Sequence, residues 1–453
     1  MAQELKIDYE KRPGWESYAK EIMVEYIQSI DEGLDIESYK ELFEATAKMP
    51  NDENKEAIAD VIFNIVRNAK TKEGYKYNEP SELDAIKSLR EKYKLPKRKI
   101  GKRELEKKIH GAWMGRIAGC LLGKPIECIW TEELYPLLKE SGNFPMHRYI
   151  MSTDLTEERC NATRYNLRGK CWADTIEYMP FDDDTNYTVM GQILIEKYGR
   201  DFKPTDVKRE WLALQPKESY CTAERVAFRN FLYGYEPPYS AEYKNPYREW
   251  IGAQIRGDYF GYINPGKPEM AAEMAWRDAS ISHVKNGIYG EMLASAMIAA
   301  APVCETAEEI VLAGLGQIPS TSRLYEDVMN VVNAYREGKS QSECADLIRS
   351  KWDERHFHHW CHTISNAMIV AYALLYGEND FGKSICLAVE MGFDTDCNGA
   401  TVGSVMGMKN GIDSIGEEWQ APVHGKLETT LIGVGITKIT DLVKKTVEHT
   451  LTK

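Results

Sequence analysis

The sequence has no long hydrophobic run and no paired cysteines. Across 453 residues, no window approaches the roughly 18 apolar residues that a membrane-spanning helix requires. The opening stretch, MAQELKIDYEKRPGWESY, has no apolar segment of the signal-peptide kind. The ten cysteines include no CxxC pair, which argues against a disulfide framework or a zinc ribbon. We therefore expect a cytoplasmic protein with reduced thiols and no membrane partner.

The chain also lacks a surplus of basic residues. It has 57 Lys and Arg against 70 Asp and Glu, which gives a formal net charge of -13. Binding to nucleic-acid phosphates needs a basic surface, so we expect no nucleic-acid partner. Alternating strand patterns are few, whereas apolar residues recur at helical spacing along most of the chain. The predicted fold class is all-α.

Two regions are predicted within this helical chain. Residues 1–100 contain three or four amphipathic helices, one of which has Ala57, Val61 and Ile65 on the face expected to be buried. A basic linker then leads into residues 101–453, where the helical pattern continues. The chemically informative motifs all fall in this second region.

Glycine recurs at every fourth position in two predicted helices. The positions are Gly111, Gly115, Gly119 and Gly123 in the first helix, and Gly399, Gly403, Gly407 and Gly411 in the second. Each interior glycine costs about 0.5–1 kcal/mol relative to alanine, and tight packing must offset this cost. We expect the two glycine faces to contact each other, which would carry Glu127 toward Asp394 and Asp396. The alternative is that each face packs against an unrelated helix.

Two acidic clusters border predicted helices. They comprise Asp182, Asp183 and Asp184 in FDDDTNYTVM, and Asp394 and Asp396 in FDTDCNG. A helix cap needs only one carboxylate, so ordinary capping explains neither cluster completely. Carboxylate oxygens without histidine or thiolate partners in the motif favour Mg²⁺ or Mn²⁺ over Zn²⁺. We predict that both clusters contribute to one metal site, with acidic helix caps as the alternative.

Three segments, in order GAWMGRIAGCLLGKPIE, FDDDTNYTVM and GFDTDCNGATVGSVMGMKNG, resemble the signature segments of the ADP-ribosylglycohydrolase family. The resemblance covers residues from about 105 to 450. It implies a compact multi-helix orthogonal bundle, here preceded by an N-terminal helical extension. It also implies two Mg²⁺ ions in a cleft, with Mn²⁺ as a substitute, and hydrolysis of a glycosidic bond at the anomeric carbon of ribose.

The resemblance further implies roles for individual residues. The metal ligands would be Glu127, Asp182, Asp183, Asp184, Asp394 and Asp396. Either Glu127 or Asp183 would act as the general base that activates the attacking water. The chain departs from the family pattern at three positions: Asp182 replaces Thr or Ser, Cys397 replaces a hydroxyl residue, and Cys120 replaces Asp.

The segment between the acidic clusters provides candidate substrate contacts. Arg256 and Asp258 lie in GAQIRGD, where the family has a small-residue segment. We expect Asp258 to repel a pyrophosphate, which favours a neutral or mildly charged glycoside, such as a nucleoside or ribosyl conjugate, over an ADP-ribosyl group. Arg256 is expected to pair with Asp258 or with a phosphate. The other candidates are His283, for which a buried core role is the alternative, Cys397 and Asn398.

Other functions fit parts of the same pattern. The HFHHWCH segment, with His358 and His362 on one helix face, allows a zinc site, although capping and packing explain it better. A carboxylate cluster also suits two-metal phosphoester hydrolysis, but neither acidic motif contains the Lys or Arg expected of a phosphate clamp. A non-catalytic protein that binds ADP-ribose or another sugar is the third possibility.

Overall fold

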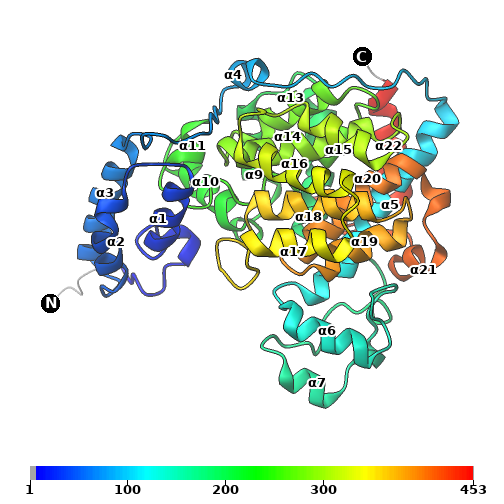
Figure 1. Cartoon of the computed structure of the whole chain (residues 1–453), viewed down its shortest axis with the longest axis horizontal. Coiled ribbons are helices and arrows are strands. Elements are labelled where there is room, and N and C mark those ends of the chain that lie inside the picture. Colours follow the sequence, from blue (N-terminus) through cyan, green and yellow to red (C-terminus); the bar gives the residue numbers. More distant parts are fainter. Residues whose placement is uncertain (1–6, 452–453) are drawn as a thin grey trace.

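A computed structural model describes residues 7–451, and almost all of their regular structure is helical (Figure 1). This confirms the predicted fold class. The N-terminal part contains α1 (Ile22–Asp31), α2 (Lys40–Ala47), α3 (Glu53–Asn68) and α4 (Leu83–Ser88). Between residues 69 and 101, the chain has only α4 as an α-helix and runs along the rest of the molecule.

Helices α1 to α3 surround a small hydrophobic core of their own, which includes Ile22, Phe43 and Ile62. The buried face of α3 is not the predicted one, because Val61 is 56% exposed whereas Ile62 is fully buried. Both faces of α3 carry apolar residues at helical spacing. The side on which α1 and α2 pack decides which face is buried.

Charged residues connect this N-terminal unit to the larger region. The Arg248 Nη1 atom lies 2.9 Å from Glu25 Oε1, and both side chains are largely buried. Gln28 Nε2 donates to Glu249 Oε2 over 2.7 Å. These contacts fix the unit against the larger region, and residue 100 stays our predicted boundary between them.

The larger region contains the remaining elements. They are α5 (Lys102–Gly123), α6 (Thr131–Glu140), α7 (Glu157–Ala162), α8 (Asp183–Tyr198), α9 (Pro204–Leu214), α10 (Thr222–Leu232), α11 (Tyr239–Glu242), α12 (Asp258–Tyr262), α13 (Pro268–Ala279), α14 (Lys285–Ala300), α15 (Ala307–Leu315), α16 (Arg323–Arg336), α17 (Gln341–Lys351), α18 (Thr363–Tyr376), α19 (Phe381–Glu390), α20 (Thr395–Asn410), α21 (Glu417–Gln420) and α22 (Ile439–Leu451), with strands β1 (Lys426–Glu428) and β2 (Ile436–Lys438). The two strands pair antiparallel.

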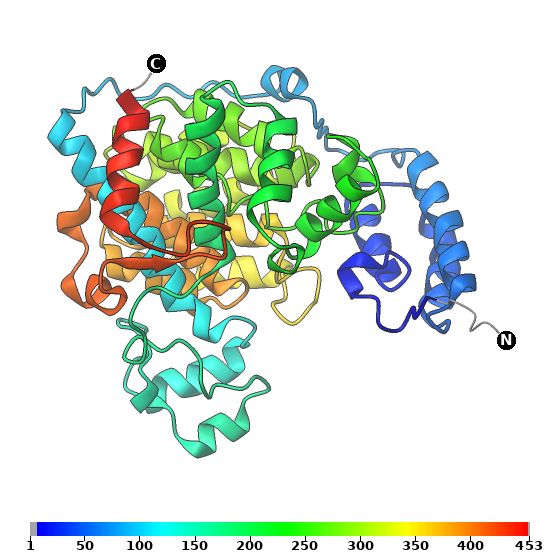
Figure 2. The same cartoon turned by 180° about the vertical axis from the view of Figure 1, so that it is seen from behind.

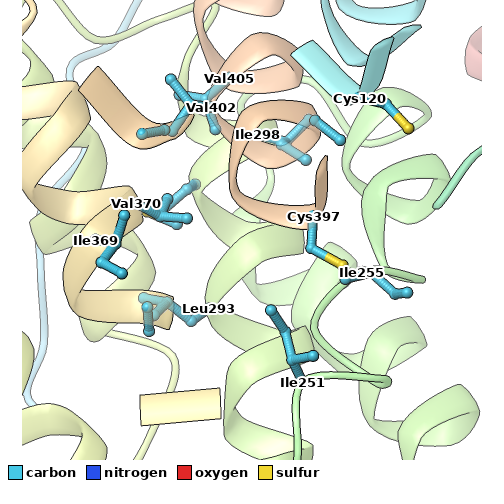
Figure 3. Packing of buried hydrophobic residues seen from close by; sticks show 14 of the residues in the cluster. Cys120, Ile251, Ile255, Leu293, Ile298, Ile369, Val370, Cys397, Val402 and Val405 are labelled. Carbon is cyan, nitrogen blue, oxygen red and sulfur yellow. The ribbon is translucent and has the colours of Figure 1, made fainter. Parts of the chain in front are cut away.

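Helices α14, α18 and α20 form the centre of this region and are buried along most of their length. Figure 3 shows part of their packing, with Leu293 on α14, Ile369 on α18 and Val402 on α20. Helix α22 packs against α5 (Figure 2), where Trp113 Nε1 donates to Thr446 Oγ1 over 2.9 Å. None of the helices within residues 7–451 is both long and apolar enough to span a membrane.

The glycine faces of α5 and α20 contact each other along antiparallel helices, as predicted. A Cβ atom added to Gly115 would lie 2.1 Å from the carbonyl oxygen of Gly403, and one added to Gly403 would lie 2.0 Å from that of Gly115. A Cβ on Gly123 would lie 2.3 Å from the amide nitrogen of Asp396. The end of α5 and the start of α20 are therefore held at the same place.

This close approach predicts that a side chain added at the crossing lowers the stability of the protein. We expect Gly403→Ala to lower the free energy of unfolding by about 3 kcal/mol or more, at or above the upper end of the usual overpacking cost. The opposing atom is a backbone oxygen, which cannot rotate away. Urea denaturation measures the change. Gly101→Ala is the control, because no atom lies near its added Cβ, and equal stability of the two variants would contradict the prediction.

Candidate metal centre

The end of α5, the start of α8 and the start of α20 bring four of the six predicted carboxylates together, whereas Glu127 and Asp183 belong to neither of the ligand groups described below. Ligand atoms of one group lie within 4.8 Å of one another, and so do those of a second group. The first group is Cys120, Asp182, Asp184 and Asp396, and the second is Asp394, Asp396 and Cys397. Because Asp396 belongs to both groups, the two groups form one continuous cluster.

Several carboxylate oxygens in this cluster have no partner. The Oδ2 atom of Asp184 and the Oδ1 atoms of Asp394 and Asp396 are buried without a hydrogen bond from any described residue. A buried polar atom without a partner costs about 1–3 kcal/mol, and more when it is charged. Hard oxygen ligands of this kind suit a divalent cation. The residues therefore fit a metal centre.

Helix capping explains the position of Asp182 but not that of Asp394. Asp182 caps α8, because its Oδ1 atom accepts the amide of Asp184 over 2.9 Å. Asp394 occupies the cap position of α20 but makes no side-chain cap hydrogen bond there. Its Oδ2 atom instead lies 3.7 Å from Cys361 Sγ. The alternative of two ordinary acidic caps is thus insufficient for the second cluster.

Two cations, one on α5 and one directly after it, neutralise part of the cluster, and the sequence analysis did not identify them. Lys124 Nζ lies 2.7 Å from Asp182 Oδ2. Arg116, which is fully buried, places its Nη2 atom 2.8 Å from Asp184 Oδ1 and its Nη1 atom 2.8 Å from Asp258 Oδ2. Arg116 lies on the glycine-rich helix and Lys124 directly follows it, so both are far in sequence from the acidic motifs. The only sign of their role in the sequence is that Arg116 and Lys124 each lie four residues from Cys120.

The remaining negative charge shifts the carboxyl pKa values upward. The Asp396 charge, followed by burial, raises the pKa of Glu127 well above its usual value. Burial and the adjacent Asp182 do the same to the pKa of Asp183. Burial and Asp182 also raise the pKa of Asp396 to about 6. Although burial opposes it, the Lys124 ammonium lowers the pKa of Asp182. Without added cations, the cluster favours protonated carboxyls.

The structure places Arg256 and Asp258 in separate buried ion pairs. Arg256 Nε lies 2.5 Å from Asp278 Oδ1, and its Nη1 atom lies 2.9 Å from Glu224 Oε1. The expected pairing of Arg256 with Asp258 is wrong, since Asp258 pairs with Arg116. The side chain of Asp258 is fully buried, so its predicted repulsion of a pyrophosphate in the cleft has no structural basis.

The other predicted substrate contacts lie near the cluster or in the core. His283 is buried, and its Nδ1 atom lies 2.8 Å from Ser282 Oγ, as the alternative core role requires. Asn398 Nδ2 donates to Asn366 Oδ1 over 2.7 Å, and the same oxygen accepts the amide of Asp394 over 3.3 Å. Asn366 therefore holds the backbone at Asp394, a function that the sequence analysis did not predict.

The histidine segment does not have the arrangement that zinc requires. Asp31 comes within reach of His358 and His362, so an acidic partner is present. However, His358 Nδ1 accepts the indole N–H of Trp250, and His362 Nδ1 accepts the amide of Ile364 at the start of α18. In a neutral ring the proton is then on Nε2, whereas a zinc-bound histidine needs that nitrogen free. Capping and packing explain the segment.

The fold and the site define an all-α protein with a carboxylate-lined candidate metal centre. The sequence profile of the ADP-ribosylglycohydrolase family matches residues 102–451. The chain belongs to this family and is therefore a hydrolase that acts on glycosidic bonds.

Comparison with solved structures finds a chain described as an ADP-ribosylglycohydrolase-related protein complex. It shares 15% sequence identity, with 77% of this chain and 98% of that chain covered and a TM-score of 0.42. The search of curated proteins found no match.

The raised pKa values predict how stability depends on pH and metal. An unfolded Asp396 has the ordinary pKa of 3.8, against about 6 in the folded protein, so the folded state binds the proton more tightly. Stability contributed by this group is lost as pH rises from about 4 to about 6. We expect the metal-free protein to melt at a lower temperature at about pH 8 than at about pH 5.

Divalent cations should restore this stability, because they replace the protons. A ligand at about 100 times its Kd adds about 2.7 kcal/mol to the stability of the folded state. We expect Mg²⁺ or Mn²⁺ to raise the melting temperature more at about pH 8 than at about pH 5. Thermal melting with and without a chelator measures both effects. An identical melting temperature in every condition would contradict the predicted centre.

Proposed function

We propose that this protein hydrolyses a ribosyl-type N- or O-glycosidic bond, in a nucleoside, a ribosyl conjugate or an ADP-ribosyl group, with the help of two divalent cations. The observation that carries this proposal is the convergence of two carboxylate groups on Asp396, with partnerless buried oxygens on Asp184, Asp394 and Asp396. Mg²⁺ is the proposed ion and Mn²⁺ the substitute, because the donor set is dominated by carboxylates.

The proposed ligands are Glu127, Asp182, Asp183, Asp184, Asp394 and Asp396. When bound, the two ions would orient a sugar diol and lower the pKa of the attacking water. Cys120 and Cys397 lie within the same ligand groups, but burial and the surrounding carboxylates raise their thiol pKa values well above the ordinary value. We therefore treat both as neutral neighbours of the ions.

Glu127 and Asp183 are our candidates for the general base. Both are half-buried, whereas Asp182, Asp184, Asp394 and Asp396 are buried. Only the first two carboxylates therefore combine partial solvent access with electrostatic interaction with the cluster. The Asp396 charge followed by burial raises the pKa of Glu127, and burial followed by the Asp182 charge raises that of Asp183.

The observed position of Asp258 removes the argument for a neutral glycoside over an ADP-ribosyl group. Since that carboxylate pairs with Arg116 away from solvent, it gives no reason to prefer a neutral glycoside. The family name points to ADP-ribosyl groups, and nucleosides share the same ribosyl part. We propose ribosyl recognition as the common requirement, by a small-molecule or ADP-ribosylated substrate.

The rival functions have less support. Phosphoester hydrolysis would need free cations as a phosphate clamp, yet Lys124 is paired with Asp182 and Arg116 is fully buried. A non-catalytic sugar-binding protein would not require the complete set of carboxylates.

The ten cysteines are all free, which supports a reducing compartment and hence the cytoplasm as the proposed location.

A substrate screen tests the function. Nucleosides, simple ribosides and ADP-ribose conjugates are incubated with Mg²⁺, and sugar or base release is measured against phosphate release. We expect release of sugar or base from at least one ribosyl compound. Phosphate release alone would favour the phosphoester alternative and contradict our proposal.

Replacement of one ligand tests the site. We expect Asp394→Asn to lose at least about 100-fold in kcat, because it removes charge that would hold an ion. Asp201→Asn, at an exposed position, is the matched control and should keep full turnover. Thermal melting checks that both variants are folded. Full turnover by folded Asp394→Asn protein would contradict the assignment.

A further inference from the structure

A pocket of about 180 Å³ opens next to the carboxylate cluster. Its lining comes from the segment just before α6, the loop after α7, and the loops before α18 and α20. The lining includes Trp130, Tyr165, Phe357, Trp360 and Phe393, together with Arg164. None of these side chains belongs to the proposed metal ligands, so the pocket needs a separate explanation.

The pocket adjoins the cluster at two points of the backbone. Among its lining residues, Cys128 directly follows Glu127, and Phe393 directly precedes Asp394. Both lining residues have positive φ angles, 68° for Cys128 and 58° for Phe393. Non-glycine residues rarely adopt this strained conformation, which concentrates at functional sites. At both points the chain turns sharply between a proposed metal ligand and the pocket wall.

The pocket also adjoins the cluster at a third point. Trp360 directly precedes Cys361, whose Sγ atom lies 3.7 Å from Asp394 Oδ2. The side chain of Phe393 is buried, while Tyr165 and Phe357 are each 43% exposed. A ligand that enters here would therefore meet aromatic surface before it reaches the carboxylates.

The charged groups of the pocket each have a polar partner, and Arg355 lies 3.6 Å from Glu132 Oε2 and 3.6 Å from Asp353 Oδ1. The Arg164 guanidinium lies 3.1 Å from the centroid of the Trp130 ring and pairs with Glu133 at 3.3 Å. Glu354 accepts the amide of Thr131 over 2.9 Å. Arginine and aromatic planes favour stacking with a flat partner. The chemistry therefore suits a planar, uncharged ligand better than a phosphate or a carboxylate.

The size of the pocket limits the ligand. Pockets for drug-sized ligands have volumes of about 300–1,000 Å³, whereas this one has about 180 Å³. One flat ring system would fill it, but a whole dinucleotide would not. The remainder of a substrate must lie outside, and the adjoining carboxylate cluster is where the sugar would lie.

We propose that this pocket binds a planar, uncharged aromatic leaving group of the substrate, of the nucleobase kind. This inference rests on the proposed function. In the reaction, the bond between the anomeric carbon and the leaving group breaks, and the oxygen of water forms the new bond to that carbon. One proton of the water is lost, and the leaving group takes up one proton. The pocket holds the leaving group while the cluster holds the sugar.

Substitution of Trp360 tests the pocket through substrate preference. The kcat/KM values for 4-nitrophenyl riboside and methyl riboside are compared, because only the first has a flat leaving group. We expect Trp360→Ala to lower the ratio of the two values by about tenfold or more, the size of effect found when one stacked base loses its aromatic partner. Trp360→Phe should largely preserve the ratio.

Tyr239→Ala is the matched control, since Tyr239 is an exposed aromatic outside this pocket. It should leave the ratio unchanged. Thermal melting verifies the folding of each variant. An unchanged ratio in folded Trp360→Ala protein would overturn the proposal.

A binding measurement separates this proposal from the proposed function. Calorimetry with free adenine, which is planar and uncharged, requires no turnover. We expect Asp394→Asn protein to bind adenine and Asp394→Asn/Trp360→Ala protein to bind it at least about tenfold more weakly. If no riboside is hydrolysed but this loss occurs, the pocket assignment stands and the hydrolase proposal fails. If ribosides are hydrolysed but adenine binds equally to both proteins, the pocket assignment is wrong.

Discussion

The close crossing of α5 and α20 is the contact on which the rest of the site depends. At this crossing each backbone occupies space that a side chain would otherwise fill, as the 2.1 Å separation between an added Gly115 Cβ and the Gly403 oxygen shows. Because the helices are antiparallel, the crossing puts the end of α5 beside the start of α20. Arg116 on α5, Lys124 just after it and Asp394 before α20 thereby come close to one another. A wider crossing would separate them, and no local motif could compensate.

The electrostatics of the cluster follow from that geometry. Four carboxylates converge, yet Arg116 and Lys124 compensate only Asp184 and Asp182. Burial and the unmatched charge together raise the pKa values of Glu127 and Asp396, and buried oxygens are left without partners. Such a cluster is unfavourable when it is both ionised and empty of cations. The same unfavourable charge creates affinity for divalent ions, so binding and stability are linked at this site.

In our proposals, the carboxylate cluster binds the sugar and the adjoining aromatic pocket binds the leaving group. Carboxylates with bound cations suit a polar sugar, and the pocket suits a flat leaving group. The strained backbone at Cys128 and Phe393 connects the two sites, because each of these residues is next to a proposed ligand. The carboxylates of the first site lie in or next to the three signature segments, whereas the aromatic lining comes largely from loops outside them. Selectivity for the leaving group would then be a property of these loops.

The sequence by itself determined the helical fold class, the four clustered carboxylates Asp182, Asp184, Asp394 and Asp396, and the contact of the glycine faces. Local residue spacing specifies these features, because helical periodicity and glycine repeats extend over only a few turns. Only the tertiary structure decided which residues pair with which. Arg256 pairs with Asp278 rather than Asp258, α3 buries Ile62 rather than Val61, and Lys124 reaches Asp182. Ion pairs and buried faces depend on segments distant in sequence, whose approach no local pattern encodes.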